Sequence, residues 1–154
     1  RDAILTRSVP ELGEWSGENM EFIRYVHSEL SEAFEYIKSY QRPEMQNIFF
    51  EQSFVFFQSQ ELDRVKELSN AKYTNEELYI PIILKSSSSR LIVRSVISAP
   101  TDDGFDQRTF YYGLYNQLAD DFADMFDDMK EGAVTPYTYF LKYRDQSSDL
   151  INPF

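Results

Sequence analysis

Two runs of alternating apolar residues in the middle of the chain constrain its fold more than any other feature. In both runs every second residue is apolar or small, and the members are Leu78, Ile80, Ile82, Leu84, Leu91, Val93, Ser95 and Ile97. A period of two is typical of a half-buried β-strand. If residues 86–89, all serine, form the turn, Ile82 pairs with Val93 and one apolar face crosses both strands. The sequence therefore predicts an antiparallel hairpin over residues 77–98.

Amphipathic helices are indicated before this hairpin. Residues 18–41 carry apolar side chains at alternating three- and four-residue steps from Ile23 to Tyr40, and Ser16 is a suitable N-cap. This heptad-like stripe is also typical of a helix that pairs with a second copy of itself. In residues 44–70 the dense phenylalanines suit a helix or a strand, and we favour a helix.

After the hairpin, the sequence predicts one long helix and a short third strand. Residues 106–131 place their apolar side chains on one helical face, and Gly132 follows as a typical C-terminal stop. Residues 136–144 are rich in aromatic side chains and alternate, which favours a strand. The pair Thr135 and Pro136 instead favours the start of a helix. We favour the strand because an isolated hairpin needs a neighbouring strand.

These elements together predict an α+β fold in a single domain of residues 1–154. Two or three amphipathic helices are expected to pack on a small antiparallel sheet built around the 77–98 hairpin. The main alternative is a mostly helical domain with one protruding hairpin. Residues 1–15 are expected to form an irregular lead-in, and residues 145–154 a frayed tail.

Charge and composition exclude several classes of partner and site. With 26 acidic and 15 basic side chains, the chain has a formal net charge of −11, which repels nucleic-acid phosphates. No apolar run reaches the roughly 18 residues that span a bilayer, so we expect no direct membrane insertion within this segment. The chain has no Cys and one His, His27, which we expect at a core boundary with one hydrogen-bonded nitrogen. We therefore expect no metal site, no cofactor and no catalytic residue.

A run of carboxylates on the predicted helix 106–131 opposes its own local energetics. Its members are Asp120, Asp121, Asp124, Asp127, Asp128 and Glu131. Each pair of like charges at i,i+4 costs about 0.2–0.5 kcal/mol, and the macrodipole disfavours negative charge towards a helix C-terminus. Something outside the helix should offset the run, either a basic partner, a divalent cation or basic side chains of this chain. The basic side chains considered are Arg90, Arg94, Lys142 and Arg144.

Tyrosines flank the same predicted helix. Tyr111, Tyr112 and Tyr115 cannot all face the core that Phe110 and Leu114 face, so some of these rings are expected at the surface. Exposed tyrosines are common at recognition sites because the ring provides contact area and the hydroxyl keeps a hydrogen bond. The predicted partner-binding surface is therefore the six carboxylates of the run together with these three tyrosines.

Three functional hypotheses follow. The first is a non-catalytic protein-interaction or assembly module that binds a basic protein partner or a second copy of itself. The second is a ligand-sensing domain of a larger signalling receptor, in which aromatic residues line a pocket. Because the chain starts at Arg1 and not at Met, that receptor could be membrane-anchored and the domain extracytoplasmic. The third is a small carboxylate-based enzyme.

Overall fold

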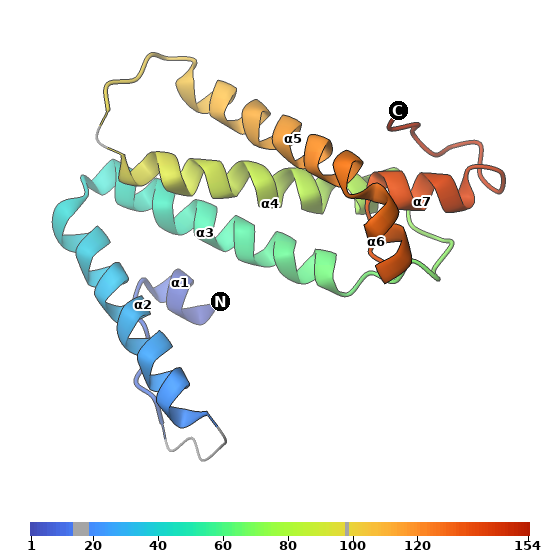
Figure 1. Cartoon of the computed structure of the whole chain (residues 1–154). Coiled ribbons are helices and arrows are strands. Elements are labelled where there is room, and N and C mark those ends of the chain that lie inside the picture. The colour runs from blue at the N-terminus through green and yellow to red at the C-terminus, as the bar shows by residue number, and fades with distance from the viewer. Residues whose placement is uncertain (14–18, 98) are drawn as a thin grey trace.

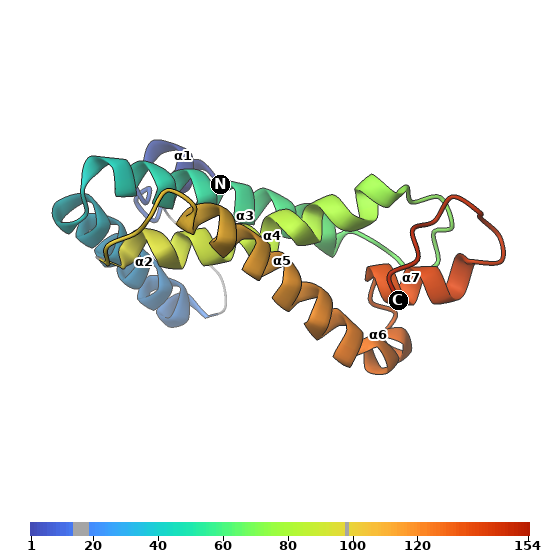
Figure 2. The ribbon, with the colours of Figure 1, turned by 90° about the horizontal axis from the view of Figure 1, so that it is seen from above.

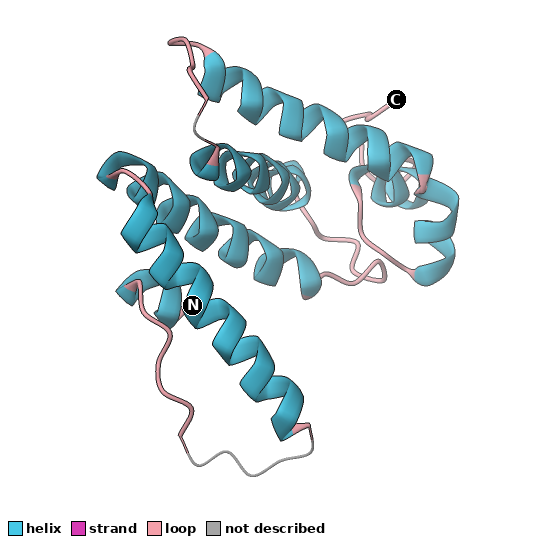
Figure 3. Cartoon of the chain, turned by 60° about the vertical axis from the view of Figure 1, so that its left-hand side comes forward, coloured by secondary structure: helices cyan, strands magenta, loops and turns pink. Residues whose placement is uncertain are grey.

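All regular secondary structure in the described residues is helical. The structure is a computed structural model that describes residues 1–13, 19–97 and 99–154. Within these ranges it contains seven helices and no strand (Figure 3). The helices are α1 (Asp2–Thr6), α2 (Met20–Tyr40), α3 (Pro43–Arg64), α4 (Asn75–Val96), α5 (Phe105–Ala123), α6 (Met125–Glu131) and α7 (Pro136–Tyr143). The prediction of an α+β fold with a small antiparallel sheet is therefore wrong.

Three long helices form the body of the molecule. α4 lies in the middle and packs against α3 on one side and α5 on the other (Figures 1 and 2). α2 leaves this bundle at the start of α3 and diverges from it, and α1 occupies the angle between them (Figure 1). α6 and α7 lie at the opposite end, beside the start of α4 (Figure 1).

The segment predicted as the 77–98 hairpin is the central helix α4. It begins with a capping box, in which Thr74 Oγ1 accepts from the Glu77 amide at 3.2 Å and the Glu77 carboxylate accepts from the Thr74 amide at 2.8 Å. The alternation of apolar residues wrongly indicated strands, because α4 is covered on two sides. A helix with two packing faces is apolar around most of its circumference, so the single stripe that identifies a surface helix is lost.

Residues 86–89 are a packing surface and not a turn. Ser86 Oγ donates to the Gly113 carbonyl at 2.6 Å, and Ser87 Oγ donates to the Phe110 carbonyl at 2.9 Å. A Cβ atom on Gly113 would lie 2.9 Å from Ser87 Cα, closer than two such atoms approach. Small residues therefore set the separation of α4 and α5 at this seam.

Apolar side chains are buried in two separate clusters. Phe34, Ile37 and Phe50 form one cluster where α2 meets α3, with Phe34 and Phe50 in edge contact at 5.1 Å between ring centroids. Leu68, Leu78, Tyr139 and Tyr143 form the other, where α7 packs beside the start of α4. Buried apolar contacts thus stabilise the molecule near both ends of the bundle.

The predicted helices near the N-terminus agree with the structure except at their boundaries. α2 confirms the helix expected in residues 18–41, whereas the proposed N-cap Ser16 lies outside the described residues. α3 confirms a helix in residues 44–70 but ends at Arg64. The expectation that residues 1–15 are irregular is wrong over α1.

The predictions for the C-terminal third need more correction. The single helix expected over 106–131 is broken at Asp124 into α5 and α6. The strand favoured for 136–144 is the helix α7, because Thr135 opens it with a capping box at the position where the sequence left a helix start open. Residues 145–154 form no helix, but they are not a frayed tail. The Asn75 side chain donates to the Asp149 carbonyl at 2.8 Å and accepts from the Ile151 amide at 2.9 Å.

Candidate functional site

The predicted acidic run is divided between two helices. Asp120 and Asp121 lie in the last turn of α5, where the macrodipole disfavours them. Asp127 and Asp128 lie in the first turn of α6, where the macrodipole favours negative charge. The break at Asp124 therefore removes part of the penalty that one continuous helix would carry.

The four basic residues considered for neutralising the run have other contacts. In chain order, Arg90 lies over the Tyr112 ring, Arg94 pairs with Asp106, Lys142 donates to the Leu68 carbonyl and Arg144 pairs with Asp145. Within the run, Lys130 Nζ lies 2.6 Å from Asp127 Oδ1. Among the described residues, none of these four forms an ion pair with a carboxylate of the run, although Arg90 and Asp120 line the same pocket between α4 and α5.

Most carboxylates of the run face solvent. Asp120, Asp124, Asp127 and Glu131 are exposed, and Asp128 is half-buried. Burial, and after it the negative charge of Asp124, raises the pKa of the Asp128 carboxyl above its ordinary value. Mutual repulsion within the run therefore persists in the folded chain.

Asp121 differs from the rest of the run because it is buried, with 7% of its surface exposed. Gln117 Nε2 donates to Asp121 Oδ1 at 2.7 Å, and Oδ2 has no hydrogen-bond partner among the described residues. Burial raises the pKa of Asp121 to about 6, although the hydrogen bond from Gln117 and the charge of Lys85 act in the opposite direction. Asp121 thus belongs to the interior and cannot contact a partner.

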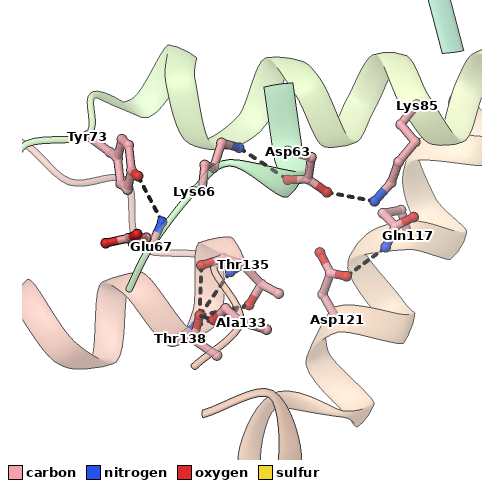
Figure 4. A network of polar contacts seen from close by, with 10 residues as sticks. All are labelled: Asp63, Lys66, Glu67, Tyr73, Lys85, Gln117, Asp121, Ala133, Thr135 and Thr138. Carbon is pink, nitrogen blue, oxygen red and sulfur yellow. Dashed lines mark hydrogen bonds and ion pairs between the residues drawn. The ribbon is translucent and has the colours of Figure 1, made fainter. Parts of the chain in front are cut away.

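A charged cluster that the sequence analysis missed lies close to Asp121. Lys85 Nζ of α4 contacts Asp63 Oδ2 of α3 at 2.8 Å, and Lys66 Nζ contacts Asp63 Oδ1 at 3.3 Å (Figure 4). Both ammonium groups converge on Asp63, and Lys85 forms no hydrogen bond to Asp121 among the described residues. The signal that could have revealed this cluster is Lys85 itself, a charged residue inside an otherwise apolar run.

The three predicted tyrosines are exposed. Tyr111, Tyr112 and Tyr115 have 56%, 60% and 68% of their surfaces exposed, as the sequence analysis expected for some of them. Phe122 and Phe126, two of the apolar side chains expected on the buried face of the 106–131 helix, are also exposed, at 52% and 69%. We call the exposed aromatic residues of α5 and α6, together with the exposed carboxylates of the acidic run, the α5–α6 surface. Its members are Tyr111, Tyr112, Tyr115, Asp120, Phe122, Asp124, Phe126, Asp127 and Glu131.

The single histidine, His27, forms a hydrogen bond between α2 and the segment before it. His27 is half-buried, and its Nε2 lies 2.7 Å from the Pro10 carbonyl oxygen, which confirms the predicted boundary role. Among the residues that the structure describes, no three His, Asp or Glu side chains are grouped so that they could hold a metal ion. The candidate site is therefore the α5–α6 surface.

Comparisons with known proteins add no function to this surface. No protein-family model, curated protein or solved structure matches the chain. In the described ranges, none of the helices combines the length and the apolar character needed to cross a membrane, which agrees with the expectation of no direct insertion by this segment. Any functional conclusion must therefore come from the chemistry of the surface.

Proposed function

We propose that this chain is a non-catalytic protein-interaction module that binds a basic protein partner through the α5–α6 surface. The observation that supports this proposal is the exposure of five aromatic rings on the same two helices as four exposed carboxylates. Tyr111, Tyr115 and Phe122 follow one another at helical spacing, so they share one face of α5. Asp120 lies on a different side of α5, beside Asn116 and Arg90, whereas Asp124, Asp127 and Glu131 lie at the break and in α6.

The chemistry of the surface suits Lys and Arg side chains. A cation can pair with an exposed carboxylate and also lie over an aromatic ring, which contributes about 0.5–1 kcal/mol at an exposed site. Contact with a partner would also remove the aromatic rings from water, where a large apolar patch is unfavourable. The net charge of −11 adds long-range attraction for a basic partner and repulsion for a second copy of this chain. The ligand-sensing and carboxylate-enzyme hypotheses stay predictions without comparable support.

The proposal is tested with a defined cationic probe and two charge-matched double variants. The probe is a labelled peptide of alternating Arg and Gly, and its dissociation constant is measured by fluorescence anisotropy. Asp120→Lys with Asp124→Lys changes the α5–α6 surface, and Glu29→Lys with Glu32→Lys changes the net charge equally on α2. We expect the α5–α6 double variant to bind at least about tenfold more weakly than the α2 double variant, since local charge pairs add to the general field.

The aromatic contribution is tested separately with Tyr115→Ser, because Tyr115 is 68% exposed and its replacement should leave the fold intact. This variant should weaken binding about two- to fivefold, in line with the loss of one cation–π contact. Equal affinities of the two double variants for the Arg-Gly peptide would show that only the total charge matters. The proposal would then be wrong.

A further inference from the structure

An apolar groove lies where the end of α3 approaches the start of α4. Its volume is about 390 Å³, and Leu62, Val65, Ile80 and Pro81 contribute its apolar lining. Leu62, Val65 and Ile80 are 60%, 76% and 48% exposed, although all three side chains are aliphatic. The groove is distinct from the α5–α6 surface, because none of its lining residues belongs to α5 or α6.

The walls of this groove are held in place by hydrogen bonds. Tyr73, another lining residue, accepts from the Glu67 amide through its hydroxyl at 2.9 Å (Figure 4). Its own amide donates to the Tyr139 hydroxyl at 3.0 Å. Lys66 also lines the groove, and its ammonium group is paired with Asp63, so the part of Lys66 available to the groove is its aliphatic stem. A preformed groove loses little entropy when it binds a ligand.

Negative charge lies along one edge of the groove. Glu76 and Glu77 both line it and are exposed. The groove therefore combines an aliphatic floor with carboxylates at one side.

We infer that this groove binds an amphipathic segment of a partner protein, with a large apolar side chain over Leu62, Val65 and Ile80 and an adjacent Lys or Arg against Glu76 and Glu77. Charge complementarity selects this occupant, because the aliphatic floor needs an apolar anchor and the carboxylate edge needs a cation. A second copy of the chain fits less well, since each copy carries a net charge of −11.

The groove is tested with a labelled helical peptide that has Leu and Phe on one face and Lys on the other. Amide shifts in a ¹⁵N–¹H NMR titration locate the peptide, and fluorescence anisotropy measures its dissociation constant. We expect the shifts to cluster at the end of α3 and the start of α4. Leu62→Ser with Val65→Ser should weaken binding at least about tenfold, because central apolar contacts dominate such interfaces. The matched control, Val93→Ser with Val96→Ser, lies at the other end of α4 and should leave the affinity unchanged.

The carboxylate edge is tested with Glu76→Gln. This variant should weaken binding about two- to fivefold and reduce its salt dependence. The control is Glu44→Gln, which removes the corresponding first-turn carboxylate of α3 at a site outside the groove.

Three outcomes would overturn the inference. The first is equal affinity of wild type and the Leu62→Ser, Val65→Ser variant for the Leu-Phe-Lys peptide. The second is a set of shifts confined to the α5–α6 surface, which would support the proposed function but not the groove. The third is a dimer, seen by sedimentation velocity, that the Leu62→Ser, Val65→Ser variant abolishes, because the occupant would then be a second copy. The groove would be supported independently of the proposed function by two results together. The Leu62→Ser, Val65→Ser variant would bind the Leu-Phe-Lys peptide more weakly, and the Asp120→Lys, Asp124→Lys variant would bind that peptide as tightly as wild type does.

Discussion

At the scale of single residues, Asp121 shows how burial changes the role of one member of a charged run. Its neighbours in sequence are exposed, whereas Asp121 turns into the bundle with one hydrogen-bond donor, Gln117, for two carboxylate oxygens. Lys85 favours the charged form, while Asp63 and Asp128 oppose it. A buried carboxylate with incomplete pairing destabilises the fold when it ionises.

This leads to a prediction about the pH dependence of stability. The folded-state pKa of Asp121, about 6, lies above the ordinary value of 3.8, so the folded chain binds this proton more tightly than the unfolded chain does. Ionisation of Asp121 therefore lowers stability progressively as the pH rises from about 4 to 6, and the full penalty is present above that range. Asp121→Asn should raise the free energy of unfolding above pH 6 by up to about 3 kcal/mol, at about 1.4 kcal/mol for each pKa unit.

The measurement is urea denaturation of both proteins at pH 4 and pH 7.5. The stabilisation by Asp121→Asn should be present at pH 7.5 and absent at pH 4, where the wild-type carboxyl is protonated. Asp120→Asn, an exposed neighbour on the same helix turn, serves as the control and should have little effect at either pH. A destabilised Asp121→Asn protein at pH 7.5 would contradict this account of the site.

At the scale of elements, the contact between α4 and α5 depends on small residues. Gly113 faces the backbone of Ser86 and Ser87 at distances that leave no room for a Cβ atom. The two serine hydroxyls donate across the contact to carbonyls of α5, so the close approach also satisfies polar groups that would otherwise be buried without partners. The seam therefore requires both small size and hydrogen-bonding capacity.

Gly113→Ala tests this contact because two effects oppose each other. Ala favours a helix interior by about 1 kcal/mol over Gly. The added Cβ would meet Ser87 Cα at 2.9 Å and the Ser86 carbonyl oxygen at 3.0 Å, both backbone atoms that move only with the whole helix. Overpacking of this kind typically costs about 1–3 kcal/mol. We therefore expect net destabilisation by up to about 2 kcal/mol in urea denaturation.

The control for this prediction is Gly13→Ala, since an added Cβ on Gly13 has no atom within 4 Å. That variant should change the midpoint of denaturation little. If Gly113→Ala were instead stabilising, helix propensity would outweigh contact, and α4 and α5 would have to separate at little energetic cost.

At the scale of the whole molecule, stability is unevenly distributed. α4 has buried residues along most of its length, from Leu78 to Ser95. In α2 the buried residues are Phe34 and Ile37, both in its second half, whereas Phe22 and Tyr25 are more than 60% exposed. The first half of α2 therefore extends from the bundle with few buried contacts (Figure 1).

Hydrogen exchange should reveal this difference. Amides with few buried contacts open through local fluctuations, whereas amides of a central helix exchange mainly through global unfolding. We expect amides of residues 22–30 to exchange at least about tenfold faster than those of residues 82–88, after correction for intrinsic rates. The measurement is native-state exchange followed by NMR. Equal protection of the two segments would show that α2 is stabilised by contacts other than those of Phe34 and Ile37.

Part of this architecture could be predicted from local sequence. The stripe from Ile23 to Tyr40 predicted α2, because a helix packed on one side keeps a simple period. The exposure of Tyr111, Tyr112 and Tyr115 could also be predicted, since residues that close in sequence cannot all face one core. The capping-box pattern of Thr74 and Glu77 was also readable, and it would have indicated α4 if it had been weighed against the alternation.

The sequence by itself determined the charge of the chain, its lack of Cys and the helix within residues 18–41, because these follow from composition or from periodicity along one face. Tertiary structure alone decided that α4 is a helix covered on two sides, that the acidic run breaks at Asp124 and that Asp121 is buried beside Gln117. The physical reason is that alternation, helix breaks and burial depend on which neighbours pack against a segment. Those neighbours come from distant parts of the chain.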